Sequence, residues 1–169
     1  MKEARPTSGK VLQALFNILG DIRGKAFLDL FSGTGRVARS ARECGADPVV
    51  AVETLPRRVK DIRSLFPGDE GVTILSMDVR RAVGFLRRKS LVFDVIFADP
   101  PYGAGWPSVL GPILFPPEGS LLAPGGVAVV EHSAKEEIPE GEGWRVIDRR
   151  EYGDTVLTFL SSAGRGGEK

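Results

Sequence analysis

Hydrophobic positions along the chain recur with two different periods, and stretches rich in glycine and proline separate the segments. Apolar side chains from Val11 to Leu19 follow helical spacing, and Thr7 or Ser8 precedes them as a candidate N-cap. The same criteria predict further helices over residues 36–44, 56–66 and 79–87. Short apolar runs predict strands over residues 26–31, 48–52, 72–75, 91–98, 127–131, 144–150 and 155–160, and residues 116–126 are expected to form a loop.

The order of these segments predicts the fold class. Strands and helices alternate through most of the chain, and the strands are apolar at nearly every position, which is typical of parallel strands covered on both faces. No helix separates the last two strands, so we expect them to finish the sheet in antiparallel fashion. The prediction is an α/β fold with a single doubly wound, mostly parallel seven-stranded sheet and an antiparallel edge strand. One domain is expected over residues 1–160, with an N-terminal helix segment at 1–20 and a disordered tail at 161–169.

Composition excludes several classes of protein. The chain has 169 residues, of which 42% are hydrophobic and 27% charged, as in an ordinary globular domain. No apolar run approaches the roughly 18 residues of a membrane span, and the start of the chain does not resemble a secretory signal. The single cysteine, Cys44, and the single histidine, His132, exclude an internal disulfide and a zinc site built from Cys and His alone. We expect a cytoplasmic protein without a bound metal, in which Cys44 packs in the core and His132 is structural.

Charge is unevenly distributed although the formal net charge is only +1. Basic side chains predominate in residues 1–25, and residues 80–89 hold four arginines and a lysine with no acidic residue. Two interpretations stay open: these segments form a basic pole that binds nucleic acid, or they are ordinary solvated helix faces.

Glycines and acidic residues follow the first three predicted strands. Gly33 and Gly35 allow a tight turn into the next helix and a close approach of the backbone to a ligand. Glu53 lies about 20 residues further on, where an acid accepts hydrogen bonds from ribose hydroxyls. Asp78 follows the third strand and can accept a hydrogen bond from an adenine amino group or cap the next helix. These positions suit NAD and S-adenosylmethionine equally.

The segment Asp99-Pro100-Pro101-Tyr102 follows the fourth strand and distinguishes these two cofactors. Proline fixes its own backbone angles and restricts the preceding residue, so the Asp99 carboxylate and the Pro100 carbonyl are expected to be held as neighbouring acceptors. Tyr102 then supplies a flat face. A planar amino group needs both features, whereas a dehydrogenase uses neither.

These four elements together resemble the Rossmann-like, class I S-adenosylmethionine-dependent methyltransferases, and Asp-Pro-Pro-Tyr resembles the signature of those that methylate exocyclic amines. The resemblance implies that Asp29 holds the methionine end of the cofactor, Glu53 the ribose, and Asp78 with Val79 the adenine. The cofactor-binding residues that it implies are Asp29, Phe31, Gly33, Gly35, Glu53, Asp78, Val79 and Asp99.

A narrower resemblance covers the chain from Arg5 to Leu160. Arg5-Pro6-Thr7, Leu15-Phe16-Asn17 and Tyr152-Gly-Asp-Thr155 are similar to the pattern of bacterial enzymes that methylate guanine N2 in small-subunit ribosomal RNA. This resemblance implies a monomer that acts on that RNA or on the assembled small subunit. The implied catalytic residues are Asp99, Pro100 and Tyr102, and the implied substrate-binding residues are Arg5, Thr7, Arg80, Arg81, Pro101 and Tyr102.

The chain departs from this family in one respect. Members usually carry a basic hairpin ahead of Arg-Pro-Thr, whereas only Met1 to Ala4 precede it here. The basic segments 1–25 and 80–89 replace the hairpin, or the substrate differs, or the chain given lacks its start. The alternatives for the acceptor are adenine N6 and glutamine N5, although glutamine enzymes usually carry Asn in place of Asp99. A nicotinamide oxidoreductase and a non-catalytic RNA-binding module are the alternatives from other classes.

Overall fold

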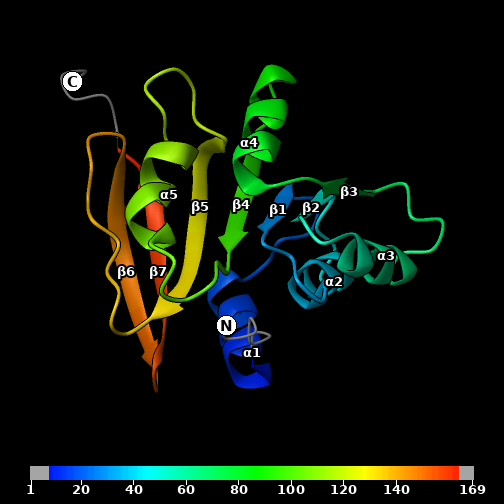
Figure 1. Cartoon of the computed structure of the whole chain (residues 1–169), viewed down its shortest axis with the longest axis horizontal. Coiled ribbons are helices and arrows are strands. Elements are labelled where there is room, and N and C mark those ends of the chain that lie inside the picture. Colours follow the sequence, from blue (N-terminus) through cyan, green and yellow to red (C-terminus); the bar gives the residue numbers. More distant parts are fainter. Residues whose placement is uncertain (1–7, 164–169) are drawn as a thin grey trace.

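The computed structural model describes residues 8–163, which form one seven-stranded sheet with helices on both faces (Figure 1). The strands are β1 (Phe27–Leu30), β2 (Val49–Glu53), β3 (Val72–Ser76), β4 (Phe93–Ala98), β5 (Leu122–Ser133), β6 (Trp144–Tyr152) and β7 (Thr155–Ser162). The helices are α1 (Gly9–Leu19), α2 (Arg36–Glu43), α3 (Pro56–Ser64), α4 (Val79–Arg88) and α5 (Trp106–Leu114). Arg5 and Thr7, implied as substrate-binding residues, lie outside the described residues.

The strand order is β3-β2-β1-β4-β5-β7-β6, and it confirms the predicted fold class. Strands β1 to β5 pair in parallel with one another, whereas β7 pairs antiparallel with both β5 and β6. The chain leaves β1 toward β2 on one side and later returns to β4 on the other side. The strand order therefore reverses between β1 and β4, which is where open α/β sheets bind ligands at the carboxyl ends of their strands.

Two hydrophobic clusters cover the two faces of the sheet. One includes Leu15 of α1 and Ala38 of α2, packed on alternate residues of the central strands such as Phe27. The other includes Leu86 of α4 and Leu110 of α5, packed on the opposite face. Helix α3 lies beside α2 on the first face, where its side chains approach the α2 N-terminus. Among the described residues, no helix is long and apolar enough to cross a membrane.

Helix α5 is absent from the sequence prediction. Its first turn contains Pro107, and Gly111 and Pro112 follow in its second half, so its composition is that of a loop. Gly111 is required by packing, since a Cβ there would collide with the ring of Trp144. A proline in the first turn costs nothing, because the N–H it lacks has no partner inside the helix.

Three smaller predictions are also wrong. Strand β5 begins at Leu122, inside the segment expected to be a loop, because Leu122 pairs with Phe93 before the register shifts. Ser161 and Ser162, assigned to a disordered tail, pair with β6 as the end of β7. Cys44 is exposed at the end of α2 rather than packed in the core.

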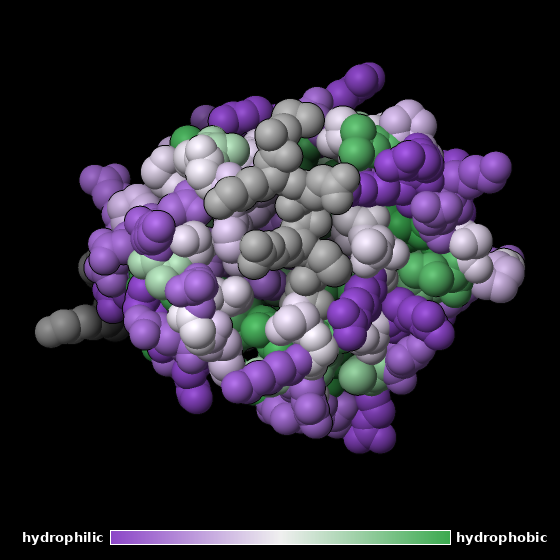
Figure 2. Space-filling view, turned by 60° about the horizontal axis from the view of Figure 1, so that its bottom comes forward, coloured by the Kyte–Doolittle hydropathy of each residue, from purple (hydrophilic) through white to green (hydrophobic). Residues whose placement is uncertain are grey.

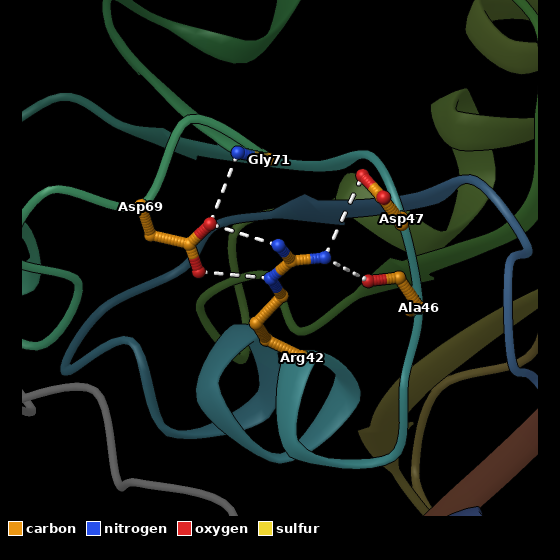
Figure 3. Close-up of polar contacts among 5 residues, drawn as sticks. All are labelled: Arg42, Ala46, Asp47, Asp69 and Gly71. Atoms are coloured by element: carbon orange, nitrogen blue, oxygen red, sulfur yellow. Dashed lines mark hydrogen bonds and ion pairs between the residues drawn. The ribbon is translucent and has the colours of Figure 1, made fainter.

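A cluster around Arg42 joins α2 to the amino ends of β2 and β3 (Figure 3). Its guanidinium donates two hydrogen bonds of 2.8 Å to the Asp69 carboxylate, and a third of 2.9 Å to the carbonyl of Ala46. Asp47 lies 3.5 Å away, and Asp69 also accepts from the N–H of Gly71. Arg42 holds the pKa of the Asp69 carboxyl below its usual range through these hydrogen bonds. This cluster fastens the end of the sheet opposite the candidate site.

Candidate functional site

A cleft of about 340 Å³ opens at the carboxyl ends of β1, β2 and β4, at the point where the strand order reverses. This volume falls within the range of small-molecule sites. Figure 2 views the molecule from the end toward which β4 and β5 point in Figure 1, and hydrophilic side chains dominate that surface. The cleft is lined by Asp29, Phe31, Ser32, Gly33, Thr34, Arg36, Val37, Val52, Glu53, Thr54, Leu55, Arg58, Val79, Phe97, Asp99, Pro101 and Trp106.

Asp29, near the end of β1, is buried in the floor of the cleft with 1% of its surface exposed. One carboxylate oxygen accepts hydrogen bonds from the Ser32 hydroxyl (2.8 Å) and from the N–H of Ala38 in α2 (3.2 Å). Burial raises the pKa of Asp29 to about 7, although both hydrogen bonds oppose the shift; the Glu53 carboxylate adds to it. This carboxyl is therefore poised to ionise when a cationic ligand enters the cleft.

Glu53 ends β2 and holds the turn that follows β1. Its Oε1 accepts from the N–H of Gly33 (2.9 Å), and its Oε2 accepts from the N–H of Leu55 (2.8 Å). Arg58 of α3 lies 3.9 Å from Oε1. Each carboxylate oxygen has a second lone pair, so Glu53 can accept hydrogen bonds from a ligand while it keeps these backbone contacts.

The turn between β1 and α2 has a backbone that requires glycine. Gly33 and Gly35 have φ values of 60° and 81°, and Phe31 also has a positive φ of 58°. A Cβ at Gly35 would lie 3.0 Å from side-chain atoms of Ile62 on α3 and of Leu65 at its C-cap. This path brings Phe31 and Gly33 to the cleft wall, while Gly35 caps α2 and is not among the lining residues.

The third predicted acid lies differently from the other two. Asp78 caps α4, where its carboxylate accepts a 2.9 Å hydrogen bond from the N–H of Arg81. Val79 lines the cleft, whereas Asp78, Arg80 and Arg81 do not. Of the two interpretations of Asp78, the capping role is the one seen here.

The Asp99-Tyr102 segment lies across the cleft from Glu53, and Asp99 and Pro101 line it. Tyr102 projects beyond the cleft, with 45% of its surface exposed, and its hydroxyl lies 3.5 Å from Oγ1 of Thr155 at the start of β7. Partial burial raises the pKa of the Tyr102 phenol, and the carboxylates of Glu131, Asp99 and Glu136 add to that shift. Tyr102 thus contacts the start of β7, and three carboxylates lie near its hydroxyl.

Trp106 is a further lining residue at the first position of α5. Its ring packs edge-on against Phe31, with 4.9 Å between centroids, and the Arg80 guanidinium lies 5.5 Å from the Trp106 centroid. The sequence gives no sign of this contact between Trp106 and Arg80. Arg36 and Arg58, which also line the cleft, are not singled out by any motif.

His132 has the structural role that its sequence context predicts. It is 1% exposed, and its ring nitrogens lie 2.7 Å from the Thr158 hydroxyl and 2.9 Å from the Ser133 carbonyl. Burial lowers the pKa of His132, so the neutral form is favoured. It is not among the residues that line the cleft.

Comparison with known proteins gives consistent results. The chain is 29% identical over 165 residues to the "Putative rRNA methyltransferase YlbH" of Bacillus subtilis (strain 168), covering 95% of this chain and 89% of that protein. It superposes with a TM-score of 0.77 on the "Putative methyltransferase yhhF" of Escherichia coli, at 20% identity, covering 96% and 92% of the two chains. A putative methyltransferase solved as a complex with SAH gives a TM-score of 0.72 at 19% identity, covering 91% of this chain and 48% of the other. The model of the family described as "Conserved hypothetical protein 95" matches residues 1–161, and the chain belongs to that family.

Proposed function

We propose that this protein transfers a methyl group from S-adenosylmethionine to the exocyclic N2 amine of a guanine in small-subunit ribosomal RNA. The observation that carries the proposal is the joint placement of Asp29, Glu53 and Asp99 around one cleft at the switch point of the sheet. The name of the Bacillus subtilis relative, which specifies ribosomal RNA, supports the substrate class. The structure solved with SAH supports the cofactor class, because it has the same fold.

The residues around the cleft fit S-adenosylmethionine. The Glu53 carboxylate at the end of β2 accepts hydrogen bonds from the two ribose hydroxyls, and Val79 packs against the adenine from the start of α4. The Gly33 turn lets the backbone approach the ligand, and Asp29 lies beneath it. Bound S-adenosylmethionine supplies an electrophilic methyl group on a positively charged sulfur. That positive charge favours the ionised form of Asp29.

The Asp99-Pro100 pair orients the acceptor amine. The lone pair of a guanine amine is delocalised into the base, so the amine must be rotated and polarised before it attacks. The Asp99 carboxylate and the Pro100 carbonyl accept hydrogen bonds from the two N–H groups of the amine and direct its lone pair toward the methyl group. As the N–C bond forms, the S–C bond of the sulfonium breaks and releases S-adenosylhomocysteine, and the methylated amine releases one proton to solvent. The protein thus contributes positioning and fixed electrostatics at the reacting nitrogen.

The target base is held outside the cofactor cleft. Tyr102, which projects from the segment with a half-exposed ring, stacks on the base, a contact worth about 1–3 kcal/mol in single-strand binders. Pro101 supplies the adjoining wall, and Arg80 and Arg81 contact RNA phosphates. A base in a single-stranded ribosomal RNA loop reaches such a site at low cost. Arg5 and Thr7, the other substrate-binding residues that the resemblance implies, lie outside the described residues.

Methyl transfer from radiolabelled S-adenosylmethionine tests the proposal. The acceptors are undermethylated small ribosomal subunits and, separately, naked small-subunit ribosomal RNA, followed by digestion to nucleosides. Label in N2-methylguanosine is the expected result, and the better acceptor shows whether an assembled surface is recognised. Label in N6-methyladenosine, or in protein, would replace the proposed acceptor with one of the alternatives.

A further inference from the structure

Helix α4 exposes basic side chains in its first turn and at its C-terminal end. The buried side of the helix carries Val79, Ala82, Val83 and Leu86. The exposed basic residues on the helix and at its C-cap are Arg80, Arg81, Arg87, Arg88 and Lys89. No acidic residue lies between the N-cap Asp78 and Asp94 of β4, so nothing on the helix itself neutralises these charges.

Several other basic residues of the described chain form ion pairs with nearby carboxylates. Arg39 pairs with Glu43 one turn along α2, and on β6 Arg149 and Arg150 pair with Glu151 and Asp148. Within residues 8–163, no ion pair involves a basic side chain of α4 or its C-cap. Basic side chains without an ion pair retain their positive charge for an external anion, although the Arg87 guanidinium donates a hydrogen bond of 2.9 Å to the Glu118 carbonyl.

The same helix begins at the candidate site. Val79 lines the cleft, and Arg80 lies over Trp106, which also lines it. From there α4 runs upward in Figure 1, opposite in direction to β4 and away from the carboxyl ends of the strands. Ten residues span about 15 Å, and phosphates along one strand of a duplex are about 3.4 Å apart along the axis. The helix therefore has the length to follow about four phosphates.

We propose that α4 binds the phosphate backbone of the RNA segment beside the target nucleotide, with Arg81 and Arg88 among the contacting residues. The inference rests on the proposed function, because it takes the RNA substrate as given and names the surface that holds it. Such contacts fix the position and register of the RNA without selecting its sequence. Asp99 and Tyr102 select the base, and α4 supplies the charge that brings RNA to them.

A charge-neutralised pair and a matched control test this surface. The variant is R81Q/R88Q, which removes two exposed charges from α4, and the control is K60Q/R63Q, which removes two exposed charges from α3 on the other face. The probes are an unmodified transcript of small-subunit ribosomal RNA and undermethylated small subunits, titrated at KCl concentrations from about 50 to 200 mM. We expect the slope of log affinity against log salt to become shallower by about 1.5 in R81Q/R88Q, since each lost phosphate contact removes 0.7–0.9.

Further readouts separate this inference from the proposed function. We expect R81Q/R88Q to raise KM for RNA while it keeps the affinity for S-adenosylmethionine and the kcat at saturating RNA, and we expect K60Q/R63Q to match wild type. If wild type methylates RNA but the salt slopes of R81Q/R88Q and wild type coincide, the role of α4 is wrong and the proposed function stands. Equal losses in both variants would also overturn it, because the effect would then reflect net charge. If wild type neither binds nor methylates either probe, both proposals fail.

Discussion

A carboxylate at the amino ends of strands β1 to β3 and one at their carboxyl ends have opposite electrostatic environments, and their pKa values are shifted in opposite directions. At the amino ends, Asp69 has a guanidinium donating to both of its oxygens, and its pKa is lowered. At the carboxyl ends, Asp29 is almost fully buried with only a hydroxyl and an N–H as donors, and its pKa is raised to about 7. The first arrangement is satisfied within the protein. The second disfavours the charged form of Asp29, so a cation bound nearby would favour its ionisation, and such shifted carboxyls are common at functional sites.

The largest effect is expected at the acceptor side of the cleft. Replacing Asp99 by Ala removes one of the two acceptors that orient the amine, so kcat for methyl transfer should fall by at least about 100-fold. Affinity for S-adenosylmethionine, measured by calorimetry, should change little. Turnover at the wild-type rate would show that Asp99 does not orient the acceptor.

The next effect concerns the ribose. Glu53→Gln replaces one carboxylate oxygen by an amide nitrogen that cannot accept a hydrogen bond, and it removes the charge of the other acceptor. We expect the Kd for S-adenosylmethionine to rise by about 10- to 100-fold. Calorimetric titration measures it, and a thermal unfolding curve of the same variant checks that the turn after β1 is intact. If the folded variant binds S-adenosylmethionine as tightly as wild type, Glu53 does not bind the ribose.

The pH dependence of stability distinguishes the two ends directly. In the folded protein Asp29 keeps its proton to about pH 7, whereas the unfolded chain releases it near pH 3.8. Folding is therefore favoured by this group below about pH 3.8, and that contribution is lost progressively as pH rises from there to about 7, by at most about 4 kcal/mol. Urea unfolding at a series of pH values should show that slope in wild type and not in Asp29→Asn.

Asp69 provides the control of opposite sign. Its lowered pKa means that its contribution is present at neutral pH and is lost as pH falls below its ordinary value near 3.8. Asp69→Asn should therefore flatten the acid side of the stability curve and leave the region near pH 7 unchanged. If plots of unfolding free energy against pH for the Asp29 and Asp69 variants run parallel to that of wild type, the two carboxyls do not have oppositely shifted pKa values.

The smallest functional effect is expected at the amino ends. Arg42→Gln loses the paired hydrogen bonds to Asp69 and the contact with Asp47 (Figure 3). We expect Tm to fall by a few degrees, because the cluster fastens α2 to the starts of β2 and β3. The affinity for S-adenosylmethionine and the rate of methyl transfer below Tm should match wild type. A specific loss of turnover would mean that this end of the sheet contributes to the site.

The parts of the fold that could be predicted from the sequence are those with a strong local pattern. Every predicted strand is present, and the turn with Gly33 and Gly35 lies beside Glu53, because parallel strands place their carboxyl ends together. Helix α5 could not be predicted, since Gly111 is required by Trp144, a residue far away in the sequence. Local propensity carries no information on such a contact.

The candidate site also contains residues that a local pattern predicts and contacts that depend on residues far apart in the sequence. Glu53 could be predicted from its place at the end of a strand, Asp99 from the Asp-Pro-Pro-Tyr motif and Asp29 from the family resemblance. The contact between Tyr102 and Thr155, by contrast, joins residues 53 apart. Nor does the sequence show which interpretation of Asp78 applies, because a helix cap and an adenine acceptor require the same residue at the same place. Roles that depend on the direction of a side chain cannot be predicted from the sequence and require the three-dimensional structure.

A crystal structure of the protein with S-adenosylhomocysteine tests the central claim most directly. We expect the ligand in the cleft at the carboxyl ends of β1, β2 and β4, with both ribose hydroxyls within hydrogen-bond distance of Glu53 and the sulfur facing Asp99 and Pro100. A ligand bound elsewhere, or a ribose that makes no contact with Glu53, would contradict the assignment of this end of the sheet as the methyl-transfer site.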